Sequence, residues 1–195
     1  MTSDTTHLPL ADRGAGGLDT EDVVAVILAD HEEMERLLRE LRDDTSDRAA
    51  VLGELADLLV GHARAEEDVV YPVLERRAQD VGEDEVEDEV EHGEEEHAEI
   101  DEALLELLEL ADAGTLEGDA FDEALEDLGE LVHHHLSEEE RNVLNPAREL
   151  VPEDDRGELG RRFLQARRRE LDAHPGRIDV VRGEVRRARE EGLLG

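Results

Sequence analysis

The sequence contains no cysteine, no lysine and no tryptophan, and it has only one tyrosine and two phenylalanines. Without cysteine, the chain can form no disulfide, no thiolate metal site and no cysteine nucleophile. The longest apolar run, Val23 to Ala29, is far too short to cross a membrane. The first residues, MTSDTTHLPLADRG, lack the basic start and apolar stretch of a signal peptide. These absences predict a soluble, cytoplasmic protein with no membrane partner.

Positive charge is also scarce. The 195 residues include 57 Asp and Glu against 21 basic residues, all of them Arg, for a net charge of −36. This is far outside the roughly 2–8 charges that suit a small domain, and at ordinary ionic strength such a surface repels itself. Strong salt relieves the repulsion, because the screening length falls to about 3 Å near 1 M. The composition resembles that of proteins from extreme halophiles, and an acidic surface argues against nucleic acid as a partner.

High net charge with few aromatic residues is also typical of disordered chains, but the aliphatic residues have helical spacing. Four segments place their interior positions three or four residues apart: Val24, Ile27, His31, Met34, Leu38 and Leu41; Leu52, Leu55, Leu59, His62, Glu66, Val69 and Val73; Val86, Val90, Gly93, His97, Ile100, Leu104 and Leu107; and Phe121, Leu125, Leu128, Val132, His135, Glu139 and Val143. Short loops between them predict an all-α fold, an antiparallel up-down-up-down four-helix bundle.

Proline and glycine set the expected ends of these helices. Pro72 predicts that the second helix ends nearby, Pro146 closes the fourth, and the third ends near Ala113-Gly114. The stretch from Glu83 to Glu96 holds ten carboxylates in fourteen residues. Because apolar spacing continues through this stretch, its acids are expected on the solvent face of the third helix.

The chain is expected to divide into three parts. Residues 1–18 are polar and aperiodic, which predicts a disordered N-terminal lead-in, and residues 19–150 hold the bundle. Residues 151–195 form an Arg-rich extension, in which residues 156–195 contain eleven Arg and seven acids.

The extension should form one or two helices, interrupted near Pro175-Gly176, with Arg167 to Arg169 on an exposed face. Either it lies back on the acidic bundle of its own chain or of a homodimer mate, or it binds a partner protein.

Histidine and glutamate recur four residues apart more often than chance allows. Glutamate accounts for 35 of the 195 residues, so chance gives one or two His-x-x-x-Glu pairs for nine histidines, but five occur. They begin at His31, His62, His92, His134 and His135. In two of them, both members lie on the interior positions of a helix. Because an unpaired buried carboxylate costs several kcal/mol, two at matching positions indicate a shared cation.

These two pairs point the same way, because the second and fourth helices of such a bundle are parallel. The first and third helices add one histidine each, so the predicted ligands are His31, His62, Glu66, His97, His135 and Glu139. Four imidazoles and two bridging carboxylates suffice for two metal ions and a solvent-derived bridge. Imidazole and carboxylate without thiolate suit iron, manganese or zinc, and a redox-capable pair in an apolar pocket favours iron.

Four sequence pieces resemble the hemerythrin-like HHE cation-binding domain: DHEEME at residue 30, HARAEEDVVYP at residue 62, EHAEI at residue 96 and HHLSEEE at residue 134. The resemblance covers about residues 20–150. It implies that the six ligands hold a non-haem di-iron centre, two iron ions with a bridging oxo or hydroxo group, that binds dioxygen or related small molecules.

Two positions depart from the invertebrate oxygen carriers of this family. Those proteins have a second histidine one turn before the third-helix ligand, where this chain has Gly93. They also carry HxxxxD on the fourth helix, where this chain has His135 and Glu139. Both differences indicate the broader HHE group, whose roles include sensing of oxygen, nitric oxide or iron, peroxide handling and storage.

We therefore expect a di-iron protein that binds or senses O2, NO or peroxide, or iron itself. Three alternatives stay open: the same centre as an enzyme acting on peroxide or oxidising Fe(II), a ferritin-like carboxylate oxidase, and a structural zinc bundle. The ferritin-like arrangement needs Glu-x-x-His on two different helices. Both matches in this chain, Glu94 to His97 and Glu89 to His92, fall on the third helix.

Other side chains near the predicted site have two interpretations each. Glu35 is an extra ligand or a solvated carboxylate, and Tyr71 either points into the pocket or, as we favour, closes the end of its helix. His92 is expected at the surface or rim. At most one of His133 and His134 is expected near the ligands.

Overall fold

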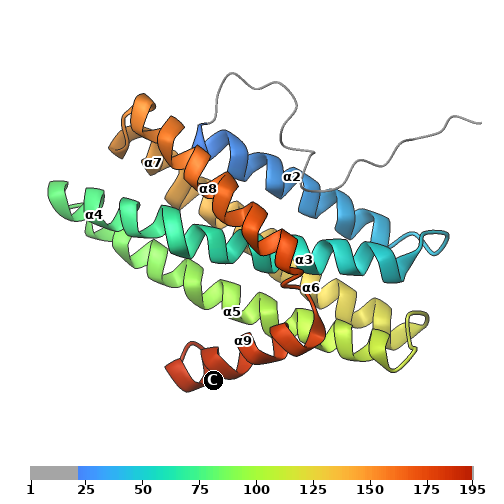
Figure 1. Cartoon of the computed structure of the whole chain (residues 1–195). Coiled ribbons are helices and arrows are strands. Elements are labelled where there is room, and N and C mark those ends of the chain that lie inside the picture. Colours follow the sequence, from blue (N-terminus) through green and yellow to red (C-terminus); the bar gives the residue numbers. More distant parts are fainter. Residues whose placement is uncertain (1–21, 195) are drawn as a thin grey trace, which may run out of the picture.

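The computed structural model describes residues 22–194, so the predicted lead-in, residues 1–18, lies outside the described residues. All regular elements in the described range are helical (Figure 1). They are α2 (Val23–Leu41), α3 (Arg48–Ala65), the π-helical turn η1 (Glu66–Val70), α4 (Tyr71–Val81), α5 (Asp84–Asp112), α6 (Asp119–Glu139), the π-helical turn η2 (Glu140–Leu144), α7 (Asn145–Leu150), α8 (Glu153–Ala173) and α9 (Ile178–Glu191). No helix in this range is long and apolar enough to span a membrane.

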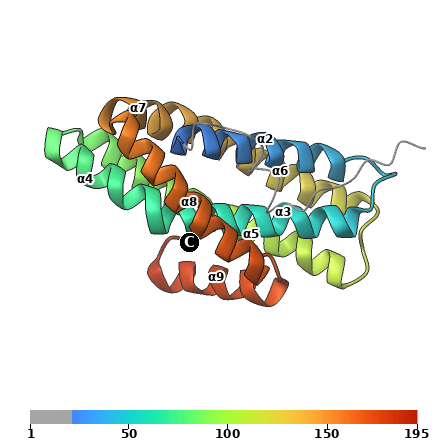
Figure 2. The same ribbon diagram turned by 45° about the horizontal axis from the view of Figure 1, so that its top comes forward.

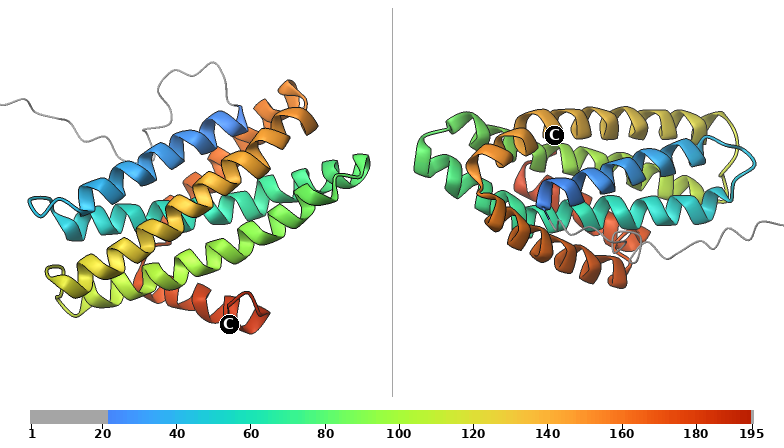
Figure 3. Two further views of the ribbon diagram at one scale, coloured as in Figure 1. Left: turned by 180° about the vertical axis from the view of Figure 1, so that it is seen from behind. Right: turned by 90° about the horizontal axis from the view of Figure 1, so that it is seen from above.

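Four rods run side by side and alternate in direction (Figures 1 and 2). They are α2, α3 continued by η1 and α4, α5, and α6 continued by η2 and α7. The α2–α3 and α5–α6 connections lie at one end of the bundle, and α4 and α7 lie at the other (Figure 3). The predicted antiparallel four-helix bundle is confirmed.

Aspartate and glycine residues cap several ends of these helices. The side chain of Asp22 accepts a hydrogen bond from the Val24 amide, and Asp47 accepts one from Ala50, so both cap the helices that follow them. Gly82, at φ 78°, ends α4 in the left-handed region, where glycine has no Cβ penalty.

The core consists of two apolar clusters at different heights of the bundle. One includes Leu38, Leu55 and Leu128. The other includes Ile27 and Val90. Along each rod, the buried histidines and glutamates fall between the residues of these clusters.

The prediction that prolines end the second and fourth helices is wrong. The second rod passes Pro72 and continues to Val81, and the fourth passes Pro146 and continues to Leu150. In each rod the proline is at the second position of a new α-helix.

A π-helical turn before each proline explains the continuation. In η1 the Tyr71 amide donates to the Glu66 carbonyl five residues back, and η2 has the same position relative to its proline. A π-helical turn holds one residue more than an α-helical turn. The hydrogen-bond pattern of the first α-helix therefore ends there, and that of the next α-helix begins. Proline's missing N–H is tolerated in the first turn of the new register.

The C-terminal helices lie on the bundle of their own chain, with α8 along α2 and α3 and α9 along α5 (Figure 1). The prediction of one or two further helices, interrupted near Pro175-Gly176, is confirmed, and the structure has two. In the break, the Gly176 amide donates to Asp57 Oδ1 at 2.9 Å. A Cβ at Gly176 would lie 2.4 Å from the Ala56 backbone, so this loop approaches α3 as closely as only glycine allows.

The expectation of an exposed Arg167 to Arg169 is wrong for its first residue. Arg168 and Arg169 are exposed, but Arg167 is buried, with its Nε 2.6 Å from Asp30 Oδ2. Arg167 follows Phe163 by one turn on the face of α8 that packs against the bundle. A charge pattern alone could not reveal this, because the partner is an acid on α2.

Candidate metal centre

All six predicted ligands are buried in the interior of the bundle. Their exposed fractions are 3% for His31, 2% for His62, 0% for Glu66, 6% for His97, 3% for His135 and 3% for Glu139. They form two overlapping groups in which one donor atom per residue lies within 4.8 Å of the others: His31, His62, Glu66 and Glu139, and Glu66, His97 and His135. Glu66 belongs to both groups, whereas Glu139 belongs to the first.

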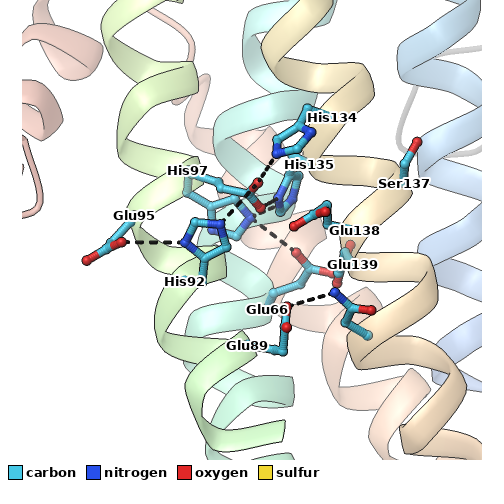
Figure 4. A network of polar contacts seen from close by, with 12 residues as sticks. Glu66, Glu89, His92, Glu95, His97, His134, His135, Ser137, Glu138 and Glu139 are labelled. Atoms are coloured by element: carbon cyan, nitrogen blue, oxygen red, sulfur yellow. Dashed lines mark hydrogen bonds and ion pairs between the residues drawn. The ribbon is translucent and has the colours of Figure 1, made fainter. Parts of the chain in front are cut away.

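We call these six buried residues the buried layer. Its four imidazoles turn their Nε2 atoms toward the bundle interior. His31 Nε2 lies 3.0 Å from Glu139 Oε2. His62 Nε2 and His97 Nε2 lie 3.2 and 3.6 Å from Glu66 Oε2. Figure 4 shows Glu66, His97, His135 and Glu139 converging from three rods.

The opposite nitrogen of every imidazole is hydrogen-bonded to a carboxylate. The Nδ1–H groups of His31, His62, His97 and His135 donate to Glu140 at 3.0 Å, Asp30 at 3.1 Å, Glu67 at 2.9 Å and Glu96 at 2.9 Å. We call these four acids the carboxylate ring. An ionised carboxylate can only accept, so each imidazole has a proton on Nδ1, and Nε2 is the atom that faces the interior and is left to bind an ion.

The carboxylate ring was not predicted from the sequence, although each member is adjacent to a predicted ligand. An acid precedes His31 and His97, and an acid follows Glu66 and Glu139. Successive helical residues are about 100° apart, so an acid beside an inward ligand faces the neighbouring rod. Placing all acids of the stretch that ends at Glu96 on the solvent face was therefore wrong, because Glu96 is 7% exposed.

The buried carboxylates lack the partners that a metal-free interior would require. Neither oxygen of Glu66 nor of Glu139 has a hydrogen-bond partner, and His31 Nε2 and His62 Nε2 also have none. Burial, together with the charge of Glu139, raises the pKa of Glu66 well above its usual range. Glu139 is equally buried, but the facing His31 outweighs burial and lowers its pKa. Without a cation, Glu66 is therefore the carboxyl that takes up a proton.

The second pair of imidazoles leads to the same conclusion. His97 Nε2 and His135 Nε2 are 3.1 Å apart, and both Nδ1 protons are already donated to the ring. At this distance the two atoms share either a proton, donated by one Nε2 to the other, or a metal ion. Nitrogens bound to one ion at about 2.1 Å are about 3 Å apart when they subtend a right angle. Four imidazole nitrogens and two carboxylates thus fit first-row metal ions.

Tyr71 lies inside the bundle, which corrects the expectation that it closes a helix end. It is 1% exposed, its ring stacks on His97 with centroids 5.9 Å apart, and its hydroxyl has no partner. A Cβ at Gly93 would lie only 2.9 Å from that hydroxyl. Tyr71 therefore occupies the space that a side chain at Gly93 would need.

The remaining candidates lie outside the buried layer. Glu35 is 43% exposed and pairs with Arg39. His133 donates to the Gly129 carbonyl at 2.8 Å. His92 and His134 are at the rim, 48% and 63% exposed.

A small cavity of about 10 Å³, large enough for about one water molecule, adjoins the imidazoles. Its lining is mostly apolar: Met34, Leu59, Ala63, Ile100, Val132 and Leu136, with His62, His97, His135 and Asp101. A surface cleft of about 670 Å³ between α3, α5, α8 and α9 shares three of these residues, Ala63, His97 and Asp101. Asp101 was not predicted as a site residue, and burial raises its pKa to about 7.

Helix α8 completes the surroundings of His62. Arg167 pairs with Asp30, the acid that holds His62, and the Phe163 ring meets the His62 ring edge-on at 5.6 Å. The C-terminal extension therefore contributes to one half of the buried layer.

The fold and the site define a class: an antiparallel helical bundle with a cation-binding site made of histidines and glutamates from all four rods. The family described as Hemerythrin HHE cation binding domain matches residues 22–147. The chain belongs to this family. No curated protein and no solved structure was found to match it, and α8 and α9 lie beyond the matched residues.

Proposed function

We propose that the chain holds a non-haem di-iron centre, with a bridging oxo or hydroxo group, that binds or senses O2, NO or peroxide. The observation that supports this most strongly is Glu66. Its side chain is fully buried, both its oxygens lack hydrogen-bond partners, and it belongs to both groups of potential ligands. A carboxylate with these properties is suited to bridge two ions.

The donor set favours iron over the other candidates. Four imidazoles and two carboxylates without thiolate suit iron, manganese or zinc, and a redox-active pair can bind an oxidising ligand reversibly. A structural zinc site would be closed by four ligands, whereas six donors serve two ions. Iron therefore stays our proposal, with zinc as the alternative to exclude.

The surrounding residues have separate roles in this proposal. The carboxylate ring fixes each imidazole with its Nε2 atom inward. The apolar cavity excludes bulk water and admits only a very small ligand. Because Ala63, His97 and Asp101 line both the cavity and the surface cleft, the ligand would pass between them.

One observation favours the enzyme alternative. Asp101 lines both the cleft and the cavity, and its pKa of about 7 lets it hold or release a proton near neutral pH. Peroxide reduction requires protons, so a carboxyl here could deliver them. Turnover is the property that separates this function from binding.

Iron-loaded full chain in molar salt tests both functions. Mixing with one equivalent of O2, NO or peroxide in a stopped-flow spectrometer should change the visible spectrum once, without further consumption of ligand. Glu66→Ala should abolish the change. Glu35→Ala, which removes an exposed acid from another His-x-x-x-Glu pair, should preserve it. Sustained peroxide loss over many turnovers would establish the enzyme instead, and no spectral change with any ligand would reject both.

A further inference from the structure

Two His-x-x-x-Glu pairs supply none of the six predicted ligands of the buried centre. His92 and Glu96 lie on α5, and His134 and Glu138 lie on the adjacent helix α6. Figure 4 shows His92 on the side of His134 and Glu138, beside His135. One donor atom each of His92, Glu96 and Glu138 lies within 4.8 Å of the others. His134 Nε2 lies 3.5 Å from Glu96 Oε1.

Glu96 connects this cluster to the buried layer, because its two oxygens face different ways. Oε2 accepts the Nδ1 proton of His135 at 2.9 Å. Oε1 is buried and has no hydrogen-bond partner, although the Glu96 side chain is only 9% exposed. Its nearest nitrogens, on His134 and His92, are 3.5 and 3.8 Å away. These distances are too long for good hydrogen bonds but suit donors that share one ion.

Glu96 has one buried oxygen, Oε1, that faces this cluster and has no hydrogen-bond partner. Leaving such an oxygen without a partner costs about 1–3 kcal/mol or more.

The other members of the cluster are open to solvent and already oriented. His92 Nδ1 lies 3.5 Å from Glu95 Oε2, which leaves His92 Nε2 toward Glu96. Glu138 is 27% exposed, and its Oε1 accepts from Arg141 at 2.8 Å. A divalent ion can therefore arrive from solvent, with the second oxygen of Glu138 as a donor.

We propose that His92, Glu96, Glu138 and His134 form a separate surface site for a divalent first-row transition ion, and that this site shares Glu96 with the buried centre. Two imidazoles and two carboxylates without thiolate are a donor set for zinc, Fe(II) or Mn(II). Two i, i+4 pairs on packed antiparallel helices hold the donors together. An ion on Oε1 withdraws charge from Glu96, which weakens the hydrogen bond that positions His135.

Zinc titration of the iron-loaded full chain tests this site. Calorimetry should find one Zn(II) bound per chain without loss of iron. His92→Ala and Glu138→Gln should each weaken this binding at least tenfold. His133→Ala is the matched control, because its ring is bound to the Gly129 carbonyl and should leave zinc affinity unchanged. Equal zinc affinity in His92→Ala and the unmodified chain would overturn the proposal, as would the absence of zinc binding.

Two further measurements separate this site from the buried centre. Glu66→Ala combined with Glu139→Ala removes both interior carboxylates but should still bind one Zn(II), so failure of the di-iron proposal would leave this result intact. In the iron-loaded chain, Zn(II) should shift the visible absorption of the centre through Glu96, and His92→Ala should abolish the shift. Zinc binding with an identical spectrum would contradict the coupling through Glu96.

Discussion

At the residue scale, the geometry of the buried layer depends on acids that are not themselves ligands. Each imidazole is held between a ring carboxylate on Nδ1 and the interior on Nε2. Two ring members, Asp30 and Glu96, are themselves buried. Removal of such an orienting partner typically lowers metal affinity by about 10–100-fold.

Removal of one ring acid should therefore weaken metal binding without removing a ligand. Glu67→Ala leaves His97 in place but removes the acceptor that fixes its ring. We expect the affinity for iron to fall about 10–100-fold, measured by competition with a chelator. Glu35→Ala, an exposed acid on α2, is the control and should match the unmodified chain. A Glu67→Ala affinity within twofold of the control would show that the ring does not position the imidazoles.

Asp101 gives a pH-dependent prediction for the metal-free chain. Burial raises its folded-state pKa from 3.8 to about 7, so its protonated form stabilises the fold. That contribution is complete below pH 4 and is lost as the pH rises through 7. Asp101→Asn cannot ionise and should be more stable than the unmodified chain above pH 7, by about 1–2 kcal/mol. A shift of three units sets an upper limit of about 4 kcal/mol, and the open cleft reduces it.

Urea unfolding at pH 4 and pH 8, in the same molar salt, measures the Asp101 effect. The difference between Asp101→Asn and the unmodified chain should be near zero at the lower pH and appear at the higher pH. An equal difference at both values would mean that Asp101 does not titrate between them.

At the element scale, two local features adapt an ordinary bundle to its site. The turn η1 begins at the interior Glu66 and the turn η2 directly follows the interior Glu139, and the two turns let both rods pass a proline. Single π-helical turns are frequent at functional sites. Helix α8 adds Arg167 and Phe163 beside His62, although it lies outside the residues that the family matches.

Arg167 should stabilise the fold through its buried pair with Asp30. Arg167→Met keeps an apolar stem but leaves the Asp30 carboxylate without its cation. We expect a loss of about 3 kcal/mol in the free energy of unfolding, since breaking one side of a buried pair typically costs 3–5 kcal/mol. Denaturant unfolding measures the loss, and Arg168→Met, on the exposed face, is the control.

A double variant distinguishes the ion pair from simple packing. Asp30→Asn together with Arg167→Met should cost less than the sum of the two single changes, because each removes the same interaction. Additive costs would contradict a direct coupling between the two residues.

The helices and the burial of the six candidate ligands were predictable because their signal is local. Apolar spacing reports directly which face of a helix is buried, and His62 with Glu66 stood out because both occupy interior positions. The predictions that were wrong, for Glu96 and Arg167, concern contacts with neighbouring helices. Glu96 resembles any acid in an acidic stretch, and Arg167 any arginine in an Arg-rich segment, until their partners on other helices are known.

At the scale of the whole molecule, the net charge of −36 is distributed unevenly. The Arg-rich extension lies on the acidic bundle, where Arg182 pairs with Glu109 and Arg189 with Glu102. These surface pairs are exposed and contribute little individually. Most carboxylates therefore still repel one another. Function in a salt-rich cytoplasm, and binding of a partner or a homodimer mate by the extension, stay predictions.

Dilution of salt should unfold the metal-free chain before the iron-loaded one. Low ionic strength lengthens the range of repulsion between surface carboxylates. Metal binds only the folded state and so shifts the equilibrium toward it. Circular dichroism between molar salt and dilute buffer follows both forms. Equal stability of the metal-free chain across this range would show that its charge is not an adaptation to salt.

The central claim is that Glu66 joins two iron ions inside the bundle. Chain loaded with iron-57 and washed with a weak chelator to clear the surface can be measured by Mössbauer spectroscopy with metal analysis. We predict two irons per chain in one antiferromagnetically coupled pair, and loss of the coupled pair in Glu66→Ala. One isolated iron per chain, or an equally coupled pair in Glu66→Ala, would contradict the account.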